Sequence, residues 1–457
     1  MSKRGARFYL GHFAGKLAYR LQRMLGMNAT YMPGEIALRL CPDYLGLIGK
    51  PKTLICVTGT NGKTTVCNLL NDILAKEGYT LLNNSAGSNT NSGIATALMK
   101  YSGLSGNSRK EIGIIEVDER SSHKIYPKIR PNYIVCTNLF RDSITRNAHA
   151  EYIKGIVDRA VNPEALMILN ADDPISSRLA ESNPRKYFAI DKLPTDKEKP
   201  SNIINDLQIC PVCGERLKYR YSRYHHIGNV YCPRGDYESP KADYPACVDI
   251  PGNTLSMELK GRTEKFELIS NSIFNIYNQV TVITVLDILG ISADRIREGF
   301  KTGGIVESRY SDSKAGKIEV ITHLAKGHNP IACSCVFDYA VNEPGEKEIL
   351  LYPDDELKHM KTSENITWAY DADFEKLAAP EVVKIVVAGR RAEDYRLRLL
   401  LAGVDGSKIF TTADEENAYK LLDTDRAVKI FILHQVYKID MAGRAKEKLL
   451  KEAEANG

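Results

Sequence analysis

A phosphate-binding loop is indicated by seven consecutive residues, Gly59-Thr60-Asn61-Gly62-Lys63-Thr64-Thr65. Two glycines allow a tight turn in which backbone N–H groups can point at a phosphate. The Lys63 ammonium can neutralise the β and γ phosphates of a nucleotide, and the Thr64 hydroxyl can bind Mg²⁺. The general pattern GxxxxGK[ST] would need glycine at Val57, so this loop is a shorter variant. The alternative is a glycine-rich turn that contains a lysine by coincidence.

A second candidate site is a set of cysteines that could bind Zn²⁺. Cys210 and Cys213 form a CxxC knuckle, Cys232 follows, and Cys247 is the candidate fourth ligand. Three or four thiolates at this spacing suit a closed tetrahedral site with a structural role. A second knuckle would have cysteine where this chain has Gly235. Alternative fourth ligands are Asp236, His225 and His226, and reduced thiols without metal are the other interpretation.

Acidic residues form two further candidates. Glu116 ends an apolar run at 112–117, where an open parallel sheet places its ligands. Asp118 and Glu119 are neighbours that could take its place, and an ordinary acidic loop is the alternative. Later in the chain, residues 365–375 alternate apolar and polar side chains, as a strand does, and end in acids at Asp371 and Asp373. Taken alone, that pattern favours a solvated strand end.

The elements around these residues predict a doubly covered parallel sheet. Residues 52–58 are typical of a strand, and residues 64–77 carry apolar side chains at the spacing of an amphipathic helix. A helix that begins at the loop would direct its partial positive charge to the same phosphate. Further strand-like runs alternate with helical stretches, which is the pattern of an α/β fold. These runs lie at 112–117, 132–138 and 165–170.

The domain organisation follows from where this alternation stops and resumes. A polar segment at 191–201 interrupts it, and a second alternating region begins near residue 311. We expect a lead-in segment, a central P-loop domain with a cysteine ribbon inserted at about 205–250, and a smaller C-terminal α/β domain. Their expected ranges are 1–50, 51–310 and 311–457.

The composition excludes several classes of protein. The 457 residues include 62 Lys and Arg against 57 Asp and Glu, a formal net charge of +5. That charge is far below the basic excess of a dedicated nucleic-acid binder, so no nucleic-acid partner is expected. No run of about 18 apolar residues occurs, so no membrane-spanning helix is expected. The cysteine spacing is not that of a small disulfide scaffold, which favours a reducing cytoplasm.

The N-terminal segment has helical periodicity. Phe13, Leu17, Leu21 and Met24 recur at helical spacing. We interpret this segment as an amphipathic helix that docks on its own domain. A helix at a membrane surface, at the inner face of the cell membrane, is the alternative.

The loop GTNGKTT resembles the ATP loop of the Mur ligase superfamily, which includes the folylpolyglutamate synthases. The resemblance implies that ATP and Mg²⁺ are used to convert a carboxylate to an acyl phosphate, which an amine then attacks. It also implies that Glu116 is a Mg²⁺ ligand and that four asparagine or aspartate residues lie near the nucleotide. These are Asn170 and Asp172 in an element similar to LNxDDP, and Asn275 and Asn278 in one similar to HNxxN. The alternatives are an Asx turn before Pro174 and a helix N-cap at Asn275.

The order of the pieces along the chain is similar to the MurT subunit family of lipid II isoglutaminyl synthases. The supporting elements are the ATP loop, the cysteine ribbon, the acids near 371–375, residues 389–392 and the segment TYMPGEIALRLCPDYL. The resemblance implies a GatD-type class I glutaminase partner that releases ammonia from glutamine. It also implies amidation of the D-glutamate α-carboxyl in the stem peptide of lipid II. Asp371 would complete the partner's Cys-His pair, with Asp373 as the fallback.

The chain departs from this family pattern near the expected acceptor contacts. Ser143, Thr145 and His149 stand where Gln, Asp and Glu are expected, and residues 303–307 lack an expected arginine, for which Arg309 could compensate. These departures leave lipid II or a related cell-wall peptide as the acceptor. Two other functions remain: a stand-alone Mur or folylpolyglutamate-type amino acid ligase, and a zinc-ribbon ATPase that binds nucleic acid.

Overall fold

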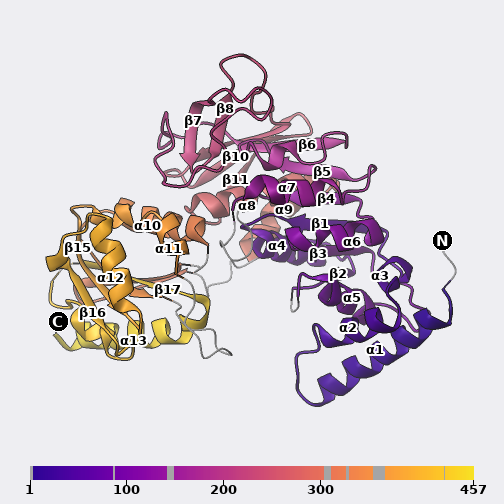
Figure 1. Ribbon diagram of the computed structural model, residues 1–457, viewed down its shortest axis with the longest axis horizontal. Helices are drawn as coiled ribbons and strands as arrows, with labels where there is room; N and C mark the ends of the chain where they lie inside the picture. The colour runs from indigo at the N-terminus through magenta and orange to yellow at the C-terminus, as the bar shows by residue number, and fades with distance from the viewer. Residues whose placement is uncertain are drawn as a thin grey trace. The chain divides into compact units, whose positions relative to one another are not determined.

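The computed structural model describes residues 4–85, 88–141, 149–302, 310–325, 329–353, 366–426 and 428–456. The chain divides into two compact units (Figure 1). The first contains the N-terminal helices, the phosphate-loop region and the cysteine-rich insert. The second contains the C-terminal sheet, together with Arg141 and residues 200–206. The sequence did not indicate that these two short segments belong to the C-terminal unit. Residues 1–50, expected as a separate lead-in segment, lie within the first unit. None of the described helices is long and apolar enough to cross a membrane.

A sheet of nine described strands forms the first unit, in the order β11-β10-β9-β6-β5-β4-β1-β3-β2. The neighbours from β2 to β9 are parallel, and β10 and β11 add antiparallel strands at one edge. The predicted alternation of strands and helices is therefore confirmed for this unit. The parallel strands are β1 (Thr53–Thr58), β2 (Leu81–Asn83), β3 (Ile112–Glu116), β4 (Tyr133–Cys136), β5 (Leu166–Asn170), β6 (Arg185–Ile190) and β9 (Tyr244–Asp249). The antiparallel ones are β10 (Thr254–Leu259) and β11 (Arg262–Glu267).

Helix α4 (Lys63–Lys76) begins immediately after the loop and lies against the sheet. Its apolar side chains at positions 66, 69, 70, 73 and 74 are buried, as their helical spacing predicted. The neighbouring helix α8 (Ile273–Ile288) is buried along most of its length and contacts α4. The remaining helices around this sheet are α6 (Ser122–Ile129), α7 (Ala150–Asp158) and α9 (Ala293–Thr302).

The N-terminal helix α1 (Ala6–Met24) packs on α2 (Met32–Leu40) and α5 (Asn91–Lys100), and the short α3 (Tyr44–Leu47) follows. The packed face of α1 carries small residues that allow close approach. A Cβ at Gly11 would lie 2.9 Å from the Ala37 carbonyl oxygen, and one at Gly15 would lie 2.8 Å from that of Pro33. The prediction that this segment forms a helix docking on its own domain is confirmed. The apolar stripe from Phe13 to Met24 is not the docking face, because those side chains face solvent.

The cysteine-rich insert contains the antiparallel hairpin β7 (Lys218–Tyr224) and β8 (Ile227–Tyr231). A buried ion-pair network ties this hairpin to the sheet. Arg223 on β7 contacts Asp172 at 3.1 Å and Asp196 at 2.7 Å. All three side chains are almost fully buried. Removing one of them would therefore leave a buried charge without its partner.

The second unit is built on a sheet of order β12-β13-β17-β14-β15-β16, in which only β12 is antiparallel to its neighbour. Helices α10 and α12 cover one face of it, and α13 covers the other. The predicted strand over 365–375 is wrong, because a short helix, α11 (Trp368–Asp371), is found there. The strands are β12 (Tyr310–Ala315), β13 (Ile318–Leu324), β14 (Lys347–Tyr352), β15 (Val382–Ala388), β16 (Ile409–Thr412) and β17 (Val428–His434). The other helices are α10 (Pro330–Asn342), α12 (Ala392–Leu401) and α13 (Ile439–Asn456).

Candidate functional site

The phosphate loop connects β1 to α4 and needs glycine at two positions. Gly59 and Gly62 have φ angles of +122° and +88°, which side chains rarely adopt. Space is also lacking at both positions. A Cβ at Gly59 would lie 2.3 Å from Thr137 Oγ1, and one at Gly62 would lie 2.2 Å from Asn278 Oδ1. The backbone conformation and the close packing both require glycine at these two positions. This argues against a glycine-rich turn that contains a lysine by coincidence.

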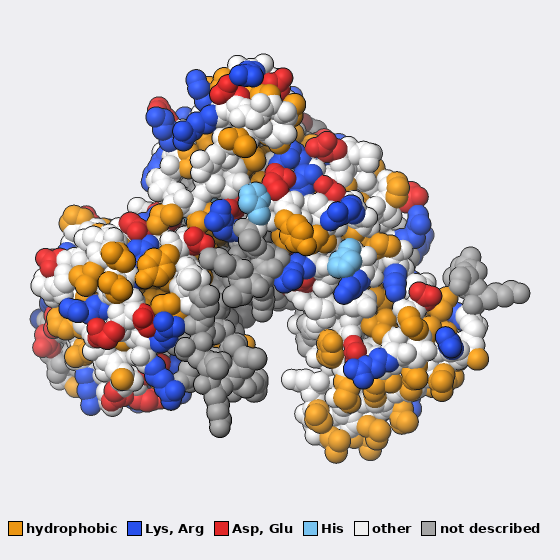
Figure 2. Space-filling view, viewed as in Figure 1, with side chains coloured by type: hydrophobic (Ala, Val, Ile, Leu, Met, Phe, Trp, Pro, Cys, Tyr) orange, Lys and Arg blue, Asp and Glu red, His pale blue; other side chains and the backbone are white. Residues whose placement is uncertain are grey.

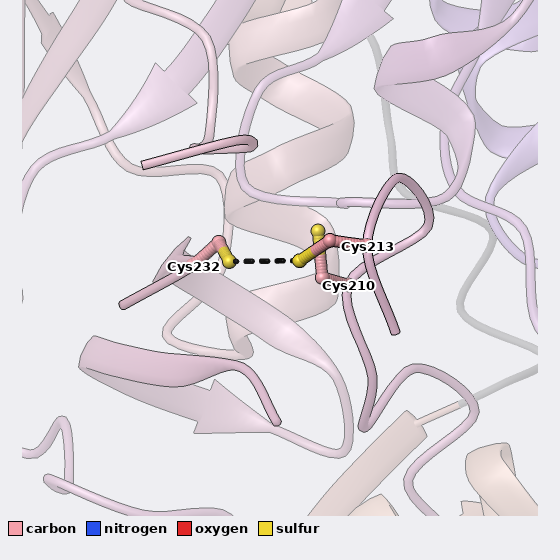
Figure 3. Close-up of side chains that lie close together, drawn as sticks. All are labelled: Cys210, Cys213 and Cys232. Carbon is pink, nitrogen blue, oxygen red and sulfur yellow. Dashed lines mark hydrogen bonds between the residues drawn. The ribbon is translucent and has the colours of Figure 1, made fainter. Parts of the chain in front are cut away.

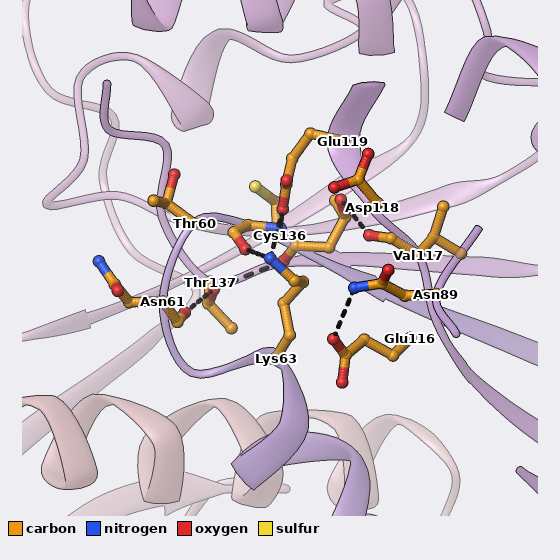
Figure 4. Close-up of polar contacts among 12 residues, drawn as sticks. Thr60, Asn61, Lys63, Asn89, Glu116, Val117, Asp118, Glu119, Cys136 and Thr137 are labelled. Atoms are coloured by element: carbon orange, nitrogen blue, oxygen red, sulfur yellow. Dashed lines mark hydrogen bonds and ion pairs between the residues drawn. The ribbon is translucent and has the colours of Figure 1, made fainter. Parts of the chain in front are cut away.

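The Lys63 side chain folds back over this turn (Figure 4). Its Nζ donates to Glu119 Oε1 at 2.8 Å and to the Gly59 carbonyl oxygen. Both members of the ion pair are largely buried, with side chains only 13% and 10% exposed. Burial acts to lower the pKa of Lys63, but the carboxylates of Glu119, Glu116 and Asp118 together outweigh it and raise the pKa. Burial conversely raises the pKa of Glu119. Lys63 is therefore stabilised in its charged form, which can bind an anion.

Glu119 has a second partner in the loop, because its Oε1 also accepts from the Gly59 N–H at 2.7 Å. The sequence suggested Glu119 only as a substitute for Glu116. The acidic run after β3 was the available signal, but only the fold shows that this side chain reaches the loop lysine.

Glu116 lies at the end of β3 and points to the start of α4. The Thr64 hydroxyl donates to Glu116 Oε2 at 2.8 Å, and Asn89 Nδ2 donates to Oε1 at 3.0 Å. A hydroxyl and a carboxylate in contact are oxygen ligands of the kind that Mg²⁺ prefers. The donor set fits the predicted ion, and Asn89, which orients the carboxylate, was missed by the sequence reasoning (Figure 4).

The far side of the loop is fixed by the segment after β4. Asn138 Oδ1 accepts from the Asn61 N–H at 3.0 Å, and the Thr137 hydroxyl donates to the Asn61 carbonyl oxygen at 2.6 Å. Thr60 donates through its hydroxyl to the Phe140 carbonyl oxygen at 3.2 Å. Thr65 lies in the first turn of α4. These contacts hold the loop from two neighbouring strands, β1 and β4.

Asn170 and Asp172, which the sequence predicted near the nucleotide, have partners inside the domain. Both residues are only 1% exposed. Asn170 Oδ1 accepts from the Asp172 N–H in an Asx turn, the alternative weighed above. The Asp172 carboxylate accepts from Tyr277 and Tyr221 and pairs with Arg223. It therefore anchors the β7–β8 hairpin to the sheet.

The other predicted pair, Asn275 and Asn278, lies in the first turns of α8. The Asn278 side chain abuts Gly62, where its Oδ1 occupies the space that a Cβ would need, and its Nδ2 donates to Asn275 Oδ1 at 3.4 Å. The helix N-cap is Ser272, so the interpretation of Asn275 as an N-cap is wrong. Asn278 therefore contacts the loop directly, whereas Asn275 contacts Asn278.

Three of the four predicted thiols come together (Figure 3). The sulfurs of Cys210, Cys213 and Cys232 lie within 4.8 Å of one another, and those of Cys213 and Cys232 are 3.5 Å apart. Two sulfurs on one tetrahedral Zn²⁺ ion would be about 3.8 Å apart, so the spacing fits this metal. Cys247 is not part of the cluster, because it is exposed on β9 in the large sheet.

Among the alternative fourth ligands, only Asp236 lies beside the thiols. A hydrogen bond with Asp236 raises the pKa of Cys213 to about 12. His225 and His226 are fully buried elsewhere, and His226 Nε2 lies 3.3 Å from Asp173 Oδ1. Among the described residues, the three thiols form the group close enough to hold a metal ion, and Asp236 lies outside that group but next to Cys213.

Asp371 and Asp373 have different surroundings in the second unit. Asp373 is buried, and its carboxylate accepts from Asn202 Nδ2 at 2.5 Å and from the Ile203 N–H at 2.7 Å. Asp371 ends α11 and is partly exposed. Partial burial raises the pKa of Asp371, and Asp206 adds to this while Arg141 opposes it. Asp373 is therefore held by hydrogen bonds inside the unit, and Asp371 is the more exposed of the two carboxylates.

The departures from the expected acceptor pattern are only partly visible. Ser143, Thr145 and residues 303–309 lie outside the described residues. His149 is described and forms the N-cap of α7, where its Nδ1 accepts from the Glu151 N–H at 3.2 Å.

Two families match this chain: the Mur ligase middle domain at residues 57–209 and the MurT ligase C-terminal domain at 325–437. The MurT subunit of lipid II isoglutaminyl synthase from Staphylococcus aureus is 31% identical over 85% of this chain and 87% of that protein. The Streptococcus pneumoniae subunit is 27% identical over 93% of both. Among solved structures, a pseudomurein peptide ligase type C from Methanothermus fervidus has a TM-score of 0.66 at 20% identity, covering 89% of this chain and 81% of its own. MurF from Acinetobacter baumannii has a TM-score of 0.59 at 14% identity, over 93% and 80%.

Proposed function

This chain belongs to the MurT family of Mur ligases, and from that premise we propose that it amidates a peptidoglycan precursor at the expense of ATP. The acceptor is the α-carboxyl of the D-glutamate in the stem peptide of lipid II or a related lipid-linked precursor. The product is D-isoglutamine. Because the acceptor is anchored in lipid, the reaction takes place at the inner face of the cell membrane.

The observation that carries this proposal is the arrangement of Lys63, Thr64 and Glu116 around one glycine turn. Lys63 neutralises the β and γ phosphates of ATP, while Thr64 and Glu116 hold Mg²⁺, which supplies Lewis-acid stabilisation of the transferring phosphoryl group when bound. An oxygen of the acceptor carboxylate attacks the γ phosphorus and ADP leaves. Ammonia then attacks the acyl carbon, and inorganic phosphate leaves with the carboxylate oxygen it received.

Residues 311–457 form the domain that we assign to docking a GatD-type class I glutaminase. Asp371 is the contact residue of this domain, because it is partly exposed while Asp373 is engaged by Asn202 and Ile203. Asp371 orients the partner's catalytic histidine and stabilises the imidazolium, as the carboxylate of a triad does. The glutaminase then delivers ammonia to the acyl phosphate.

The test of this function is an amidation assay with a lipid-linked precursor, followed by mass spectrometry of the stem peptide. We expect amide to form with ATP and ammonium ions alone, and with ATP and glutamine once the glutaminase is added. Formation of a peptide bond to an added amino acid, without need of ammonia, would contradict the proposal and support a stand-alone amino acid ligase.

We further propose that Cys210, Cys213 and Cys232 bind a structural Zn²⁺ ion and that Asp236 completes the site. Purified protein is expected to contain about one zinc per chain by elemental analysis, because a closed tetrahedral site binds the metal tightly. Cys210→Ser combined with Cys213→Ser should abolish the metal content. Asp236→Ala should leave three ligands and release zinc faster to a chromogenic chelator.

Cys247→Ser is the matched control for these variants, because it removes an exposed thiol outside the cluster. It should retain wild-type zinc. Metal-free native protein would contradict the site as a whole. An unchanged rate of zinc release from Asp236→Ala would contradict only the assignment of Asp236 as the fourth ligand.

A further inference from the structure

Helix α1 has two apolar faces, only one of which is covered. The covered face includes Phe8, Gly11 and Gly15, which pack into the domain. The other face, which we name the outer stripe, is exposed on the opposite side of the helix. The outer stripe consists of Leu10, Phe13, Leu17, Leu21 and Met24, with exposures of 48–82%.

The outer stripe continues into the turn between α1 and α2. The exposed apolar side chains there are Leu25, Met27, Tyr31 and Met32. Figure 2 shows hydrophobic side chains gathered over this corner of the first unit, where Figure 1 places α1 and α2. Scattered exposed leucines are ordinary, but a contiguous apolar patch of this kind marks a site of interaction. The folding of the domain does not need it, since α1 is already packed through its glycine face.

The positive charge of the N-terminal segment indicates an anionic partner. The first acidic residue of the chain is Glu35, and the 34 residues before it include six cations. Lys16 donates to backbone carbonyl oxygens and belongs to the packing of α1, whereas Arg7, Arg20 and Arg23 are exposed. Arginines beside an apolar stripe can bury their stems and keep the guanidinium among headgroups.

We propose that the outer stripe binds the surface of an anionic lipid bilayer, with α1 lying in the interface. Leucine, phenylalanine and methionine enter the acyl boundary, and Arg20 and Arg23 contact phosphate headgroups. A bilayer surface can bind a convex helix without a pocket or a strand edge. An anionic bilayer also attracts the excess positive charge of this segment. The binding itself is independent of the proposed amidation; only its use, to hold the enzyme at a lipid-linked acceptor, rests on that function.

The test is flotation of the full-length protein with vesicles of phosphatidylcholine containing phosphatidylglycerol. Wild-type protein should float with these vesicles, less so at high salt, and should not float with pure phosphatidylcholine. Leu17→Gln combined with Leu21→Gln should lower binding at least about tenfold, because each leucine inserts several methylene groups. Arg20→Gln combined with Arg23→Gln should lower it about 25-fold, about fivefold for each cation.

The matched control is Leu397→Gln combined with Leu401→Gln, two exposed leucines with the same spacing on α12. This pair should float like the wild type, and so should Lys63→Ala, which separates failure of membrane binding from failure of ATP use. Equal loss in the control pair, or wild-type flotation of the Leu17 and Leu21 variant, would overturn the proposal. So would a dimer in light scattering that dissociates in that variant while wild-type protein ignores vesicles, since the stripe would then bind a second copy of the chain.

Discussion

Replacing Lys63 with alanine is expected to abolish ATP-dependent amidation, with a loss of at least about a thousandfold in kcat. Lys63 is the only residue of the loop motif with a full positive charge, and its ammonium lies over the glycine turn where we propose that the phosphates bind. The loss should be equal with ammonium ions and with glutamine plus glutaminase, because both routes pass through the same acyl phosphate. Initial rates of amide formation with each nitrogen source measure it.

Two controls make this result specific. Lys76→Ala removes an exposed lysine at the last turn of the same helix and should keep wild-type activity. Lys63→Ala also leaves the Glu119 carboxylate buried without its cation, so the double variant Lys63→Ala with Glu119→Gln should recover thermal stability while staying inactive. Substantial amidation by either folded Lys63 variant would contradict the assignment of the loop.

Replacing Asp371 with asparagine is expected to remove glutamine-driven amidation while ammonium-driven amidation continues within about twofold of the wild type. Asparagine keeps the size of the side chain but cannot stabilise an imidazolium, and such a change in a triad lowers the rate by about 10⁴. The glycine loop at which we propose that ATP binds lies in the other unit, so this substitution leaves it unchanged. Parallel assays with both nitrogen sources, in the presence of the glutaminase, give the ratio of the glutamine-driven rate to the ammonium-driven rate.

Asp373→Asn is the matched control, two residues away. The Asp373 carboxylate accepts two hydrogen bonds while buried, and an asparagine would turn an N–H toward one of those donors. We expect this variant to lower the free energy of unfolding by about 1–3 kcal/mol without a selective effect on glutamine use. Equal loss of both nitrogen sources in a stable Asp371→Asn protein would contradict the triad role.

The parts of the molecule that local sequence determines were predictable. The loop, its strand and its helix form one continuous segment, so glycine positions, apolar spacing and Lys63 all appear in order along the chain. The contact of Thr64 with Glu116 also followed from topology, because parallel strands end at one edge of a sheet. The sequence did not distinguish Glu119 from Glu116 and Asp118, since three acids within four residues look alike until the turn after β3 directs each side chain.

Features that depend on tertiary contacts were not predictable. Arg223 lies 51 residues from Asp172 in the chain, so nothing near Asp172 indicated that its carboxylate was already paired. Cys247 has a plausible spacing for zinc, but β9 carries it into the large sheet. In α1, the exposed stripe is more apolar than the packed face, because that face relies on glycines for close contact. Periodicity therefore identified the helix but assigned it the wrong buried side.

Transfer of oxygen from the acceptor to phosphate shows whether the carboxylate is activated as an acyl phosphate. The acceptor's α-carboxyl is labelled with ¹⁸O and amidated with ATP and ammonium ions, and the released phosphate is analysed by mass spectrometry. We predict one ¹⁸O atom in each phosphate released with amide. Amide formation accompanied by unlabelled phosphate would contradict this mechanism.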